Sequence, residues 1–335
     1  MIVGFAYDLR MDPPPGAKEP EDFDAEFDAP ETIDIIARAI EKSGHQVVRI
    51  GNVGQLLKRL DTLKDEVDLV FNITEGMGGR NRESQVPMLL EYQGIPYVGA
   101  DALSLGLSLD KVLAKQVFQA EGIPTPRSFQ IRDVEKLTDL PIPLPLFVKP
   151  RHEGSSKSLT EKSRVRTFQE LKEQADWIIK TYRQPALVEE FISGMEFTVA
   201  VIGNDPPEAL APIQIQIDGE NDLGDRFYTF GHISSTALKY LCPAQIPKAL
   251  EEKIKALAVR AYRAIDCRDF GRVDFRVDKR GKPWVLEVNP LPSLSMEDVF
   301  EIVAKHMKLS FDEMIGKILD VAIEREGLRE CVESR

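Results

Sequence analysis

The sequence predicts a mixed α/β and α+β protein with a parallel sheet near its N-terminus. Short apolar segments alternate with amphipathic helical segments over residues 1–100, a pattern typical of a parallel sheet covered by helices. After breaks rich in proline, the rest of the chain again alternates short strands and helices. At 335 residues the chain is long enough for about two or three domains.

The N-terminal part supplies the elements of the predicted parallel sheet. A helix over 31–43 places isoleucines at helical spacing and ends at Gly44, a residue common just after a helix. The Pro-rich stretch 12–28, before this helix, is expected to be a loop. A second, short helix near Leu56 is expected between the strands 46–50 and 68–73. The expected strands, the last at the sheet edge, are 2–6, 46–50, 68–73 and 95–98.

A boundary near 99–108 separates this part from an α+β body. We expect an N-terminal domain over 1–100, a central one over 101–183 and a C-terminal one over 184–328. The expected helices of the body are 109–121, 168–182, 248–265 and 311–325. Its expected strands are 146–149, 186–191, 196–202, 272–278 and 284–289.

Composition excludes several classes of protein. The net charge is −12, from 43 basic and 55 acidic residues, and an acidic surface disfavours nucleic acid as a partner. The apolar run 140–148 is broken by prolines and too short to span a membrane, and the N-terminus lacks the basic flank of a signal peptide. Three widely spaced cysteines without a CxxC pair indicate a reducing cytoplasm.

The strongest chemical signal is a pair of alternating strands near the C-terminal end, joined by a turn at 279–282. If the turn has two residues, Asp274 lies opposite Glu287, and Arg272 lies opposite Asn289. Opposed carboxylates repel each other, so this face calls for a cation. Hard oxygen ligands suit Mg²⁺ holding phosphates better than Zn²⁺. A solvated hairpin with scattered charges is the alternative.

Weaker signals lie elsewhere in the body. An apolar strand ends in Lys149, and the Gly/Ser-rich stretch 153–158 offers N–H groups and hydroxyls to an anion, although taken alone this stretch is better explained as a plain turn. Acids at 189–190 and Glu196 follow strands and could accept hydrogen bonds from an amino group or ribose, or lie on the surface. Lys111, near a helix start, reads alone as a solvated lysine.

Together these segments resemble a known family. The ordered motifs are Leu-Ser-Leu-Asp-Lys111, Val-Lys149-Pro with Glu-Gly-Ser-Ser156, Glu189 with Ser-Gly-Met-Glu196-Phe-Thr-Val, Cys242-Pro-Ala, Gly-Arg-Val-Asp274 and Leu-Glu-Val-Asn289. With these motifs the chain resembles the D-alanine–D-alanine ligases of the ATP-grasp superfamily over residues 85–325. The resemblance implies an ATP-grasp fold preceded by a Rossmann-like, parallel-sheet domain.

The resemblance implies an ATP site. Lys111 and Lys149 would contact the phosphates, and the loop 153–158 would close over them. Glu189 would lie near the adenine amino group, and Glu196 would bind the ribose. Further nucleotide contacts are expected from Glu153, Gly154, Ser155, Ser156, Phe191, Ile192 and Leu286.

It also implies a metal site and a catalytic set. Asp274, Glu287 and Asn289 would hold two Mg²⁺ ions, with Mn²⁺ as an alternative, in agreement with the strand-pairing argument. The implied catalytic residues are Arg272, Ser155 and His232. The arginine would stabilise charge on the transferring phosphoryl group and on the tetrahedral intermediate.

The implied reaction joins a carboxylate to an amine. The carboxylate attacks the γ-phosphate of ATP to give an acyl phosphate and ADP, and the amine then displaces phosphate to form an amide. No protein nucleophile is needed. The partners would be small amino-acid or amine substrates, and the resemblance to often dimeric ligases leaves a homodimer open.

The motifs that bind the two substrates in the family are altered in this chain. The N-terminal Gly-Gly-x-Ser stretch with its substrate-binding Glu is missing, and His232 stands where a loop lysine is expected. The Ser-Leu pair that binds the second carboxylate falls near 298–299, where an acid would repel it. Residues without an assigned role are Glu31, Glu75, Arg80 and Arg82. We therefore expect intact ATP chemistry with altered substrates.

Three hypotheses follow. The first is an ATP-dependent carboxylate–amine ligase, D-alanine–D-alanine ligase-like, whose amino-acid substrates and their stereochemistry are open. The second is an authentic D-alanine–D-alanine ligase for cell-wall precursors. The third is a non-catalytic ATP-binding regulatory protein, which the retained metal-type ligands disfavour.

Overall fold

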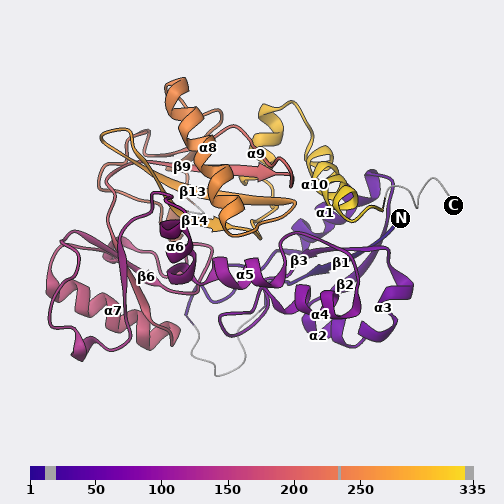
Figure 1. The fold of residues 1–335 in the computed structure, drawn as a ribbon, viewed down its shortest axis with the longest axis horizontal. Coiled ribbons are helices and arrows are strands. Elements are labelled where there is room, and N and C mark those ends of the chain that lie inside the picture. Colours follow the sequence, from indigo (N-terminus) through magenta and orange to yellow (C-terminus); the bar gives the residue numbers. More distant parts are fainter. Residues whose placement is uncertain (12–19, 233–234, 329–335) are drawn as a thin grey trace.

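The computed structural model describes residues 1–11, 20–232 and 235–328. Within these ranges the strands form one parallel and two antiparallel sheets, which confirms the predicted α/β and α+β class (Figure 1). Part of the predicted Pro-rich loop, residues 12–19, lies outside the described residues, as does Cys331. No helix in the described part of the chain combines the length and apolar character needed to cross a membrane.

The N-terminal sheet is parallel with the strand order β2-β1-β3-β4, so the edge position expected for the last strand is confirmed. Its strands are β1 (Ile2–Tyr7), β2 (Gln46–Gly51), β3 (Leu69–Ile73) and β4 (Tyr97–Val98). Its helices are α1 (Pro30–Lys42), α2 (Val53–Leu57), α3 (Leu60–Glu66) and α4 (Gln85–Gln93). The chain leaves α1 through Gly44, whose φ of 89° suits glycine.

A second sheet, with the order β5-β8-β6-β7, is antiparallel and packs against α7 (Phe168–Tyr182) (Figure 1). Its strands are β5 (Ser128–Ile131), β6 (Leu146–Pro150), β7 (Arg164–Val165) and β8 (Ala186–Glu190). Because β8 pairs with both β5 and β6, this unit extends at least to Glu190. The expected division at 183/184 would cut the sheet.

The helix expected over 109–121 is two helices, α5 (Ala102–Leu109) and α6 (Lys111–Ala120). The break between them falls at Asp110, whose carboxylate accepts hydrogen bonds from the backbone N–H groups of Val112 and Leu113. Aspartate is a strong N-cap, so a new helix starts here. As a result Lys111 occupies the first turn of α6.

The third sheet has the order β12-β11-β9-β13-β14, with β10 paired to β9, and all its pairs are antiparallel. Its strands are β9 (Gly194–Ile202), β10 (Glu208–Ala209), β11 (Ile213–Ile217), β12 (Leu238–Leu241), β13 (Phe270–Asp278) and β14 (Pro283–Asn289). Helix α8 (Lys248–Ala264) covers one face by burying Ile254, Ala258 and Ala261. Helices α9 (Val299–His306) and α10 (Phe311–Arg325) follow.

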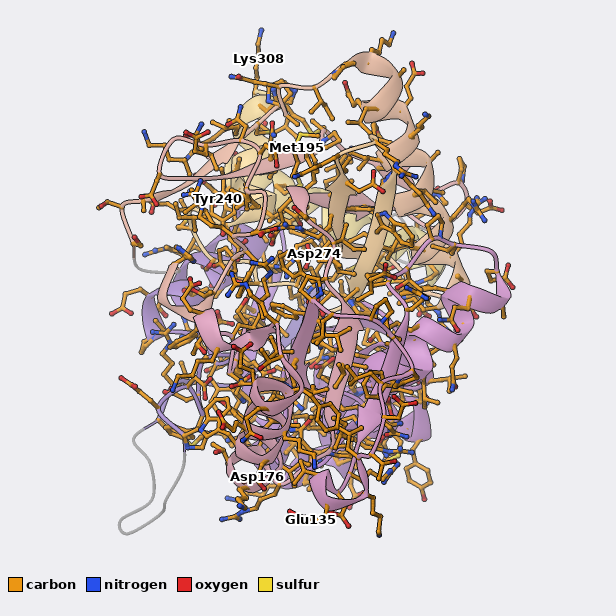
Figure 2. The ribbon with its side chains drawn as sticks, turned by 90° about the vertical axis from the view of Figure 1, so that its left-hand side faces the viewer. Glu135, Asp176, Met195, Tyr240, Asp274 and Lys308 are labelled. Carbon is orange, nitrogen blue, oxygen red and sulfur yellow. The ribbon has the colours of Figure 1, made fainter. Side chains whose placement is uncertain are left out.

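The N-terminal sheet and the third sheet share one apolar core. Helix α1 packs against α10, and the core they form includes Ile36, Leu319 and Phe270 of β13. Buried Asp269 ties the same parts together, because it accepts hydrogen bonds from the N–H of Gly99 and from Arg325. Beyond Phe270 the same face of β13 carries Arg272 and Asp274, which line a cavity, and Asp274 lies near the middle of the view in Figure 2.

Candidate active site

The β13–β14 hairpin pairs Asp274 with Glu287 and Arg272 with Asn289, as predicted. The predicted two-residue turn is wrong, however. The N–H of Asp278 bonds to the carbonyl of residue 282, which leaves a three-residue turn with a glycine at φ 74°. A β-bulge after Asp274 adds one residue to β14 and restores the predicted pairing at the site.

The bulge also decides which side chains of β14 face the cavity. Strict alternation would point Leu286 and Glu287 to opposite faces. In the structure Val285 and Val288 are buried in the core, while Leu286 and Glu287 both line the cavity. The bulge therefore presents an apolar and an acidic side chain next to each other.

The cavity, about 880 Å³ in volume, lies between the three sheets. It is lined by these residues predicted for nucleotide, metal or catalysis: Lys111, Lys149, Glu153, Gly154, Ser155, Ser156, Glu189, Phe191, Ile192, Glu196, Arg272, Asp274, Leu286, Glu287 and Asn289. The structure thus brings residues from distant motifs to one place. Their individual roles stay predictions.

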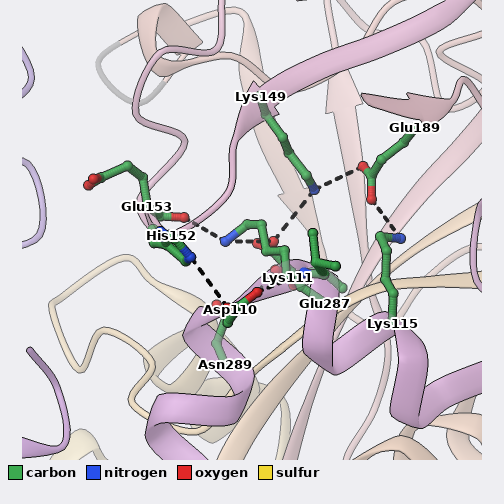
Figure 3. A network of polar contacts seen from close by, with 12 residues as sticks. Asp110, Lys111, Lys115, Lys149, His152, Glu153, Glu189, Glu287 and Asn289 are labelled. Atoms are coloured by element: carbon green, nitrogen blue, oxygen red, sulfur yellow. Dashed lines mark hydrogen bonds and ion pairs between the residues drawn. The ribbon is translucent and has the colours of Figure 1, made fainter. Parts of the chain in front are cut away.

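Three lysines and two glutamates form a network at one end of the cavity, called the lysine end below (Figure 3). Glu189 is held between Lys115 Nζ at 2.6 Å and Lys149 Nζ at 3.0 Å. Glu287 lies 3.4 Å from Lys111 Nζ and 3.7 Å from Lys149 Nζ. Burial alone would raise the pKa of Glu287, but these lysines outweigh it and lower the pKa to about 2.

Lys115 is a member of this network that sequence reasoning missed. It is 1% exposed and also donates to Thr125 Oγ1 at 2.8 Å. From its helical position alone it is an ordinary lysine, and only the fold, which brings it to Glu189 of β8, reveals its role in the network. Both oxygens of Glu189 lie close to lysines, yet Oε1 accepts no hydrogen bond from any described residue, so the contact to an adenine amino group stays a prediction.

Arg272 and Asp274 form a bidentate pair, with both N···O distances at 3.1 Å. Asp274 also accepts from Thr198 Oγ1 at 2.7 Å and from Asn289 Nδ2 at 2.9 Å. Because the amide nitrogen of Asn289 is used here, its carbonyl oxygen is left for another partner. The guanidinium is thereby held in a fixed plane beside the cavity.

The Gly/Ser-rich loop is held down by an acidic segment from the N-terminus. Glu26 accepts from the N–H of Gly154 at 2.7 Å and pairs with Lys157 at 3.2 Å and Arg82 at 2.5 Å. Asp22 accepts from the N–H of residue 158 at 2.6 Å. A Cβ at position 154 would lie 2.7 Å from Glu26 Oε1, so this approach requires glycine.

The residues expected near the base and ribose lie on the strand side of the cavity. Glu196 pairs with Arg276 at 2.8 Å, and the carbonyl of Ile192 accepts from Arg276 Nε at 2.9 Å. The ring of Phe191 stacks against Arg164, whose guanidinium carbon is 4.6 Å from the ring centre. These contacts fix the segment after β8 in place.

His232 is the predicted catalytic residue that the structure does not place in the cavity lining. Its Nδ1 accepts from the N–H of Thr229 at 3.0 Å, within the short helical turn Phe230–His232. Tyr228 and Tyr240 line the cavity there instead. The imidazole has its hydrogen-bond partner within this local turn. The geometry therefore does not support the expectation that His232 takes the place of the family's loop lysine.

The residues without an assigned role separate into two groups. Glu75 lines the cavity, and Arg82 lies behind it in its pair with Glu26. Arg80 reaches Asp110 at 3.4 Å, outside the lining. Glu31 is exposed in the first turn of α1.

The donor set fits a hard divalent cation. Asp274 and Glu287 face each other across paired strands, and the free carbonyl of Asn289 adds a third oxygen. No cluster of three or more His, Cys, Asp or Glu positioned for a metal is present among the described residues, because the third candidate ligand is an amide. Arg272, Lys111 and Lys149 also lie beside these carboxylates, so side chains of the protein supply part of the positive charge that the strand pairing calls for, and the metal site stays a prediction.

Fold and site together define a class. A parallel N-terminal sheet, two antiparallel sheets enclosing a cavity, and lysines facing opposed carboxylates are the features of an ATP-grasp carboxylate–amine ligase. The family model for the D-ala D-ala ligase C-terminus matches residues 117–320. The chain belongs to the D-alanine–D-alanine ligase family, and it is an ATP-dependent ligase that forms C–N bonds, as predicted.

Individual relatives support this assignment. The D-alanine–D-alanine ligase of Carboxydothermus hydrogenoformans is 33% identical over 88% of this chain and 93% of its own. The uncharacterized protein y4sG of Sinorhizobium fredii is 36% identical over 87% of both chains. The ATP-complexed D-alanine–D-alanine ligase of Bacillus anthracis has a TM-score of 0.73 at 21% identity, over 97% of this chain and 98% of its own, and so supports the fold.

Proposed function

We propose that the protein joins a carboxylate substrate to an amine through an acyl phosphate made from ATP, and that its substrates are not two D-alanines. One observation carries the proposal. The cavity keeps Lys111, Lys149 and Arg272 together beside opposed carboxylates, whereas Asp298 lines the region where the family binds a second carboxylate.

The lysine end supports binding of a triphosphate. The contacts of Lys111 and Lys149 to Glu287 are long, at 3.4 Å and 3.7 Å, so phosphate oxygens can replace the carboxylate as closer partners. Lys111 also donates to the carbonyl of Glu153 at 2.5 Å, which connects it to the Gly/Ser-rich loop. That loop offers N–H groups and hydroxyls, including Ser155 and Ser156, to the same phosphates.

Arg272 supports the chemical steps. Its bidentate pair with Asp274 holds the guanidinium rigid, so its remaining N–H groups are oriented toward negative charge that develops during transfer. Asp274, Glu287 and Asn289 would hold Mg²⁺, with Mn²⁺ as the alternative. When bound, such an ion neutralises phosphate charge and fixes the triphosphate for in-line transfer.

The substrates tested should be varied in charge and stereochemistry. Phosphate release is measured with ATP, Mg²⁺ and panels of D- and L-amino acids and amines, and each new amide is detected by mass. We expect ATP- and Mg²⁺-dependent product with at least one pair. Absence of phosphate release above background with every pair would contradict the proposal.

A second candidate is D-alanine–D-alanine ligase itself, which the names of relatives such as the Carboxydothermus enzyme favour. Efficient phosphate release with D-alanine alone, together with the dipeptide as sole product, would select it. Product from other substrates and none from D-alanine would exclude it.

Two broader expectations can be tested with the purified protein. The free thiols of Cys242 and Cys267 support a reducing compartment such as the cytoplasm. Localisation of a tagged full-length chain tests this. A homodimer, proposed by analogy with related ligases, is tested by light scattering.

A further inference from the structure

A second part of the cavity lining, beside the lysine network, carries several carboxylates, and one of them, Glu83, lies close enough to Lys111 for their charges to interact. Asp28, Glu75 and Glu83 line it from the N-terminal part, and Asp298 lines it from the loop before α9. Neighbouring carboxylates in this group are close enough to repel one another. Asp298 repels the carboxylate of Asp28, and both Asp28 and Glu83 repel the carboxylate of Glu75. We call these four residues the acidic wall.

Three carboxylates of the acidic wall lack partners of the kind found at the lysine end, whereas Asp298 accepts a hydrogen bond from the N–H of Val299. Glu83 is only 8% exposed and lines the cavity, yet its carboxylate makes no hydrogen bond or ion pair with any described residue. Glu75 and Asp28 are half-buried, and their side chains also make no hydrogen bond or ion pair with any described residue. A buried carboxylate without a partner is costly when charged.

The nearest cations are already engaged. Arg82 donates to Glu26 and to the carbonyl of His152 at 2.7 Å. Arg10 donates through Nε to the carbonyl of Phe27 at 3.1 Å. With these cations engaged elsewhere, no described side chain forms an ion pair with Asp28, Glu75 or Glu83.

The protonation of these groups agrees with the geometry. Burial raises the pKa of Asp28 to about 7, and repulsion by Asp298 and Asp8 adds to this effect. Burial likewise raises the pKa of Glu83 to about 7 and the pKa of Glu75 well above its usual value. A cation placed among them would favour the charged forms.

We propose that the acidic wall binds a substrate with at least two cationic groups, as basic amino acids and polyamines have. This proposal rests on the ligase function proposed above and names the substrate class of the same site. One ammonium group, as in alanine, would leave most of these carboxylates unpaired. Two or more ammonium or guanidinium groups can form charge-assisted hydrogen bonds with several of them.

The arrangement also orients such a substrate. Arg272 and Asp298 both line the cavity and lie close enough for their charges to interact, so a cationic group near Asp298 and Asp28 lies beside the place where Arg272 attracts negative charge. A carboxylate would be repelled from the acidic wall. In an amino acid, the wall therefore takes the cationic end and leaves the carboxylate free to turn toward Arg272.

Calorimetry tests the substrate class directly. The full chain, with Mg²⁺ and the non-hydrolysable analogue AMP-PNP, is titrated with D- and L-lysine, ornithine and arginine, with putrescine and spermidine, and with alanine and glutamate. We expect at least one cationic compound to bind about tenfold or more tightly than alanine and glutamate. Alanine or glutamate binding as tightly as every cationic compound would overturn the proposal.

A variant assigns the binding to the acidic wall. Glu83→Gln removes one charge with little change in shape and should weaken the cationic compound about tenfold. Asp28→Asn provides an independent second variant, and the exposed Glu173→Gln is the matched control that should bind like wild type. Wild-type affinity in both Glu83→Gln and Asp28→Asn would overturn the proposal.

Product detection separates this inference from the ligase function. Amide formed from neutral amino acids alone would overturn the cationic substrate and leave the ligase intact. Tight, Glu83-dependent binding of a cation with no product in any pair would support the acidic wall and contradict the ligase. The basic amino acids and the polyamines form separate arms, so the preferred arm identifies the source of the charge.

Discussion

The two ends of the cavity neutralise charge in opposite ways. At the lysine end each carboxylate has a protein cation beside it, as Glu189 has Lys115 and Lys149. At the acidic wall the side chain of Glu83 is also buried, but it makes no ion pair or hydrogen bond with any described residue. At the lysine end the charges are already paired, and the lysines can exchange their carboxylate partners for phosphate. At the acidic wall the carboxylates gain cationic partners only when a ligand binds.

This contrast also separates what the two ends do. Paired charges keep the lysine end rigid and poised for a ligand of defined shape. Unpaired charges at the acidic wall reduce stability and supply binding energy for a substrate, a trade-off common at functional sites. The two ends should therefore respond to mutation with different signs.

The largest effect is expected at Arg272. Arg272→Lys keeps a charge but loses the bidentate pair with Asp274, so kcat should fall about 10²-fold with little change in the KM for ATP. Steady-state phosphate release measures both constants. The surface variant Arg263→Lys is the control, and a kcat within about threefold of wild type would remove Arg272 from the chemistry.

Glu287→Gln should lower turnover at least about tenfold, because it removes one charge from the metal-binding set. The Mg²⁺ concentration for half-maximal activity should rise as well. A magnesium titration of the variant and of the control Glu173→Gln measures this. Wild-type turnover at every Mg²⁺ concentration would contradict the assignment of Glu287.

Glu26→Gln tests the contact that holds the Gly/Ser-rich loop. Losing the charged acceptor of the Gly154 N–H and the partner of Lys157 should raise the KM for ATP about fivefold. Hydrogen exchange across 153–158 should become faster. Unchanged exchange with unchanged KM would show that the acidic segment does not support the loop, and exposed Glu135→Gln is the control.

The smallest effect has the opposite sign. Because the pKa of Glu83 is raised to about 7 in the folded protein, its charge opposes folding above that pH and ceases to do so near pH 4.5. Glu83→Gln should therefore raise the Tm by about 2–5 °C at pH 8, and by less at pH 5. A thermal melt at both pH values measures the difference, and a lower Tm for the variant at pH 8 would contradict the unpaired state.

The lysine end could be predicted from the sequence because its residues lie in motifs on regular elements. Alternation along β13 and β14 gave the correct facing of Asp274 and Glu287, although the turn and the bulge were both missed and compensated each other. The longer turn and the bulge each shift the pairing by one residue, and the two shifts cancel. The alternation of side chains along a strand cannot reveal either of them. The α5–α6 break was missed because the capping by Asp110 outweighs a continuous helical pattern.

The acidic wall could not be predicted in the same way. Asp28 lies in an irregular acidic segment, and Glu83 precedes a helix, so neither carries a periodic signal. Their proximity depends on packing of the N-terminal part against residues more than a hundred positions away, as in the contact of Glu26 with Gly154. The sequence alone supported an expectation of altered substrates. The fold was needed to infer that the substrate is cationic, because only the fold brings these carboxylates together.

A ligand-bound structure tests the account most directly. Crystals would be grown with AMP-PNP, Mg²⁺ and the cationic compound that binds most tightly in calorimetry. The account predicts phosphate oxygens within about 3 Å of Lys111 and Lys149, and an ammonium or guanidinium group hydrogen-bonded to Glu83 or Asp28. A triphosphate bound away from those lysines, or an uncharged group against the acidic wall, would contradict it.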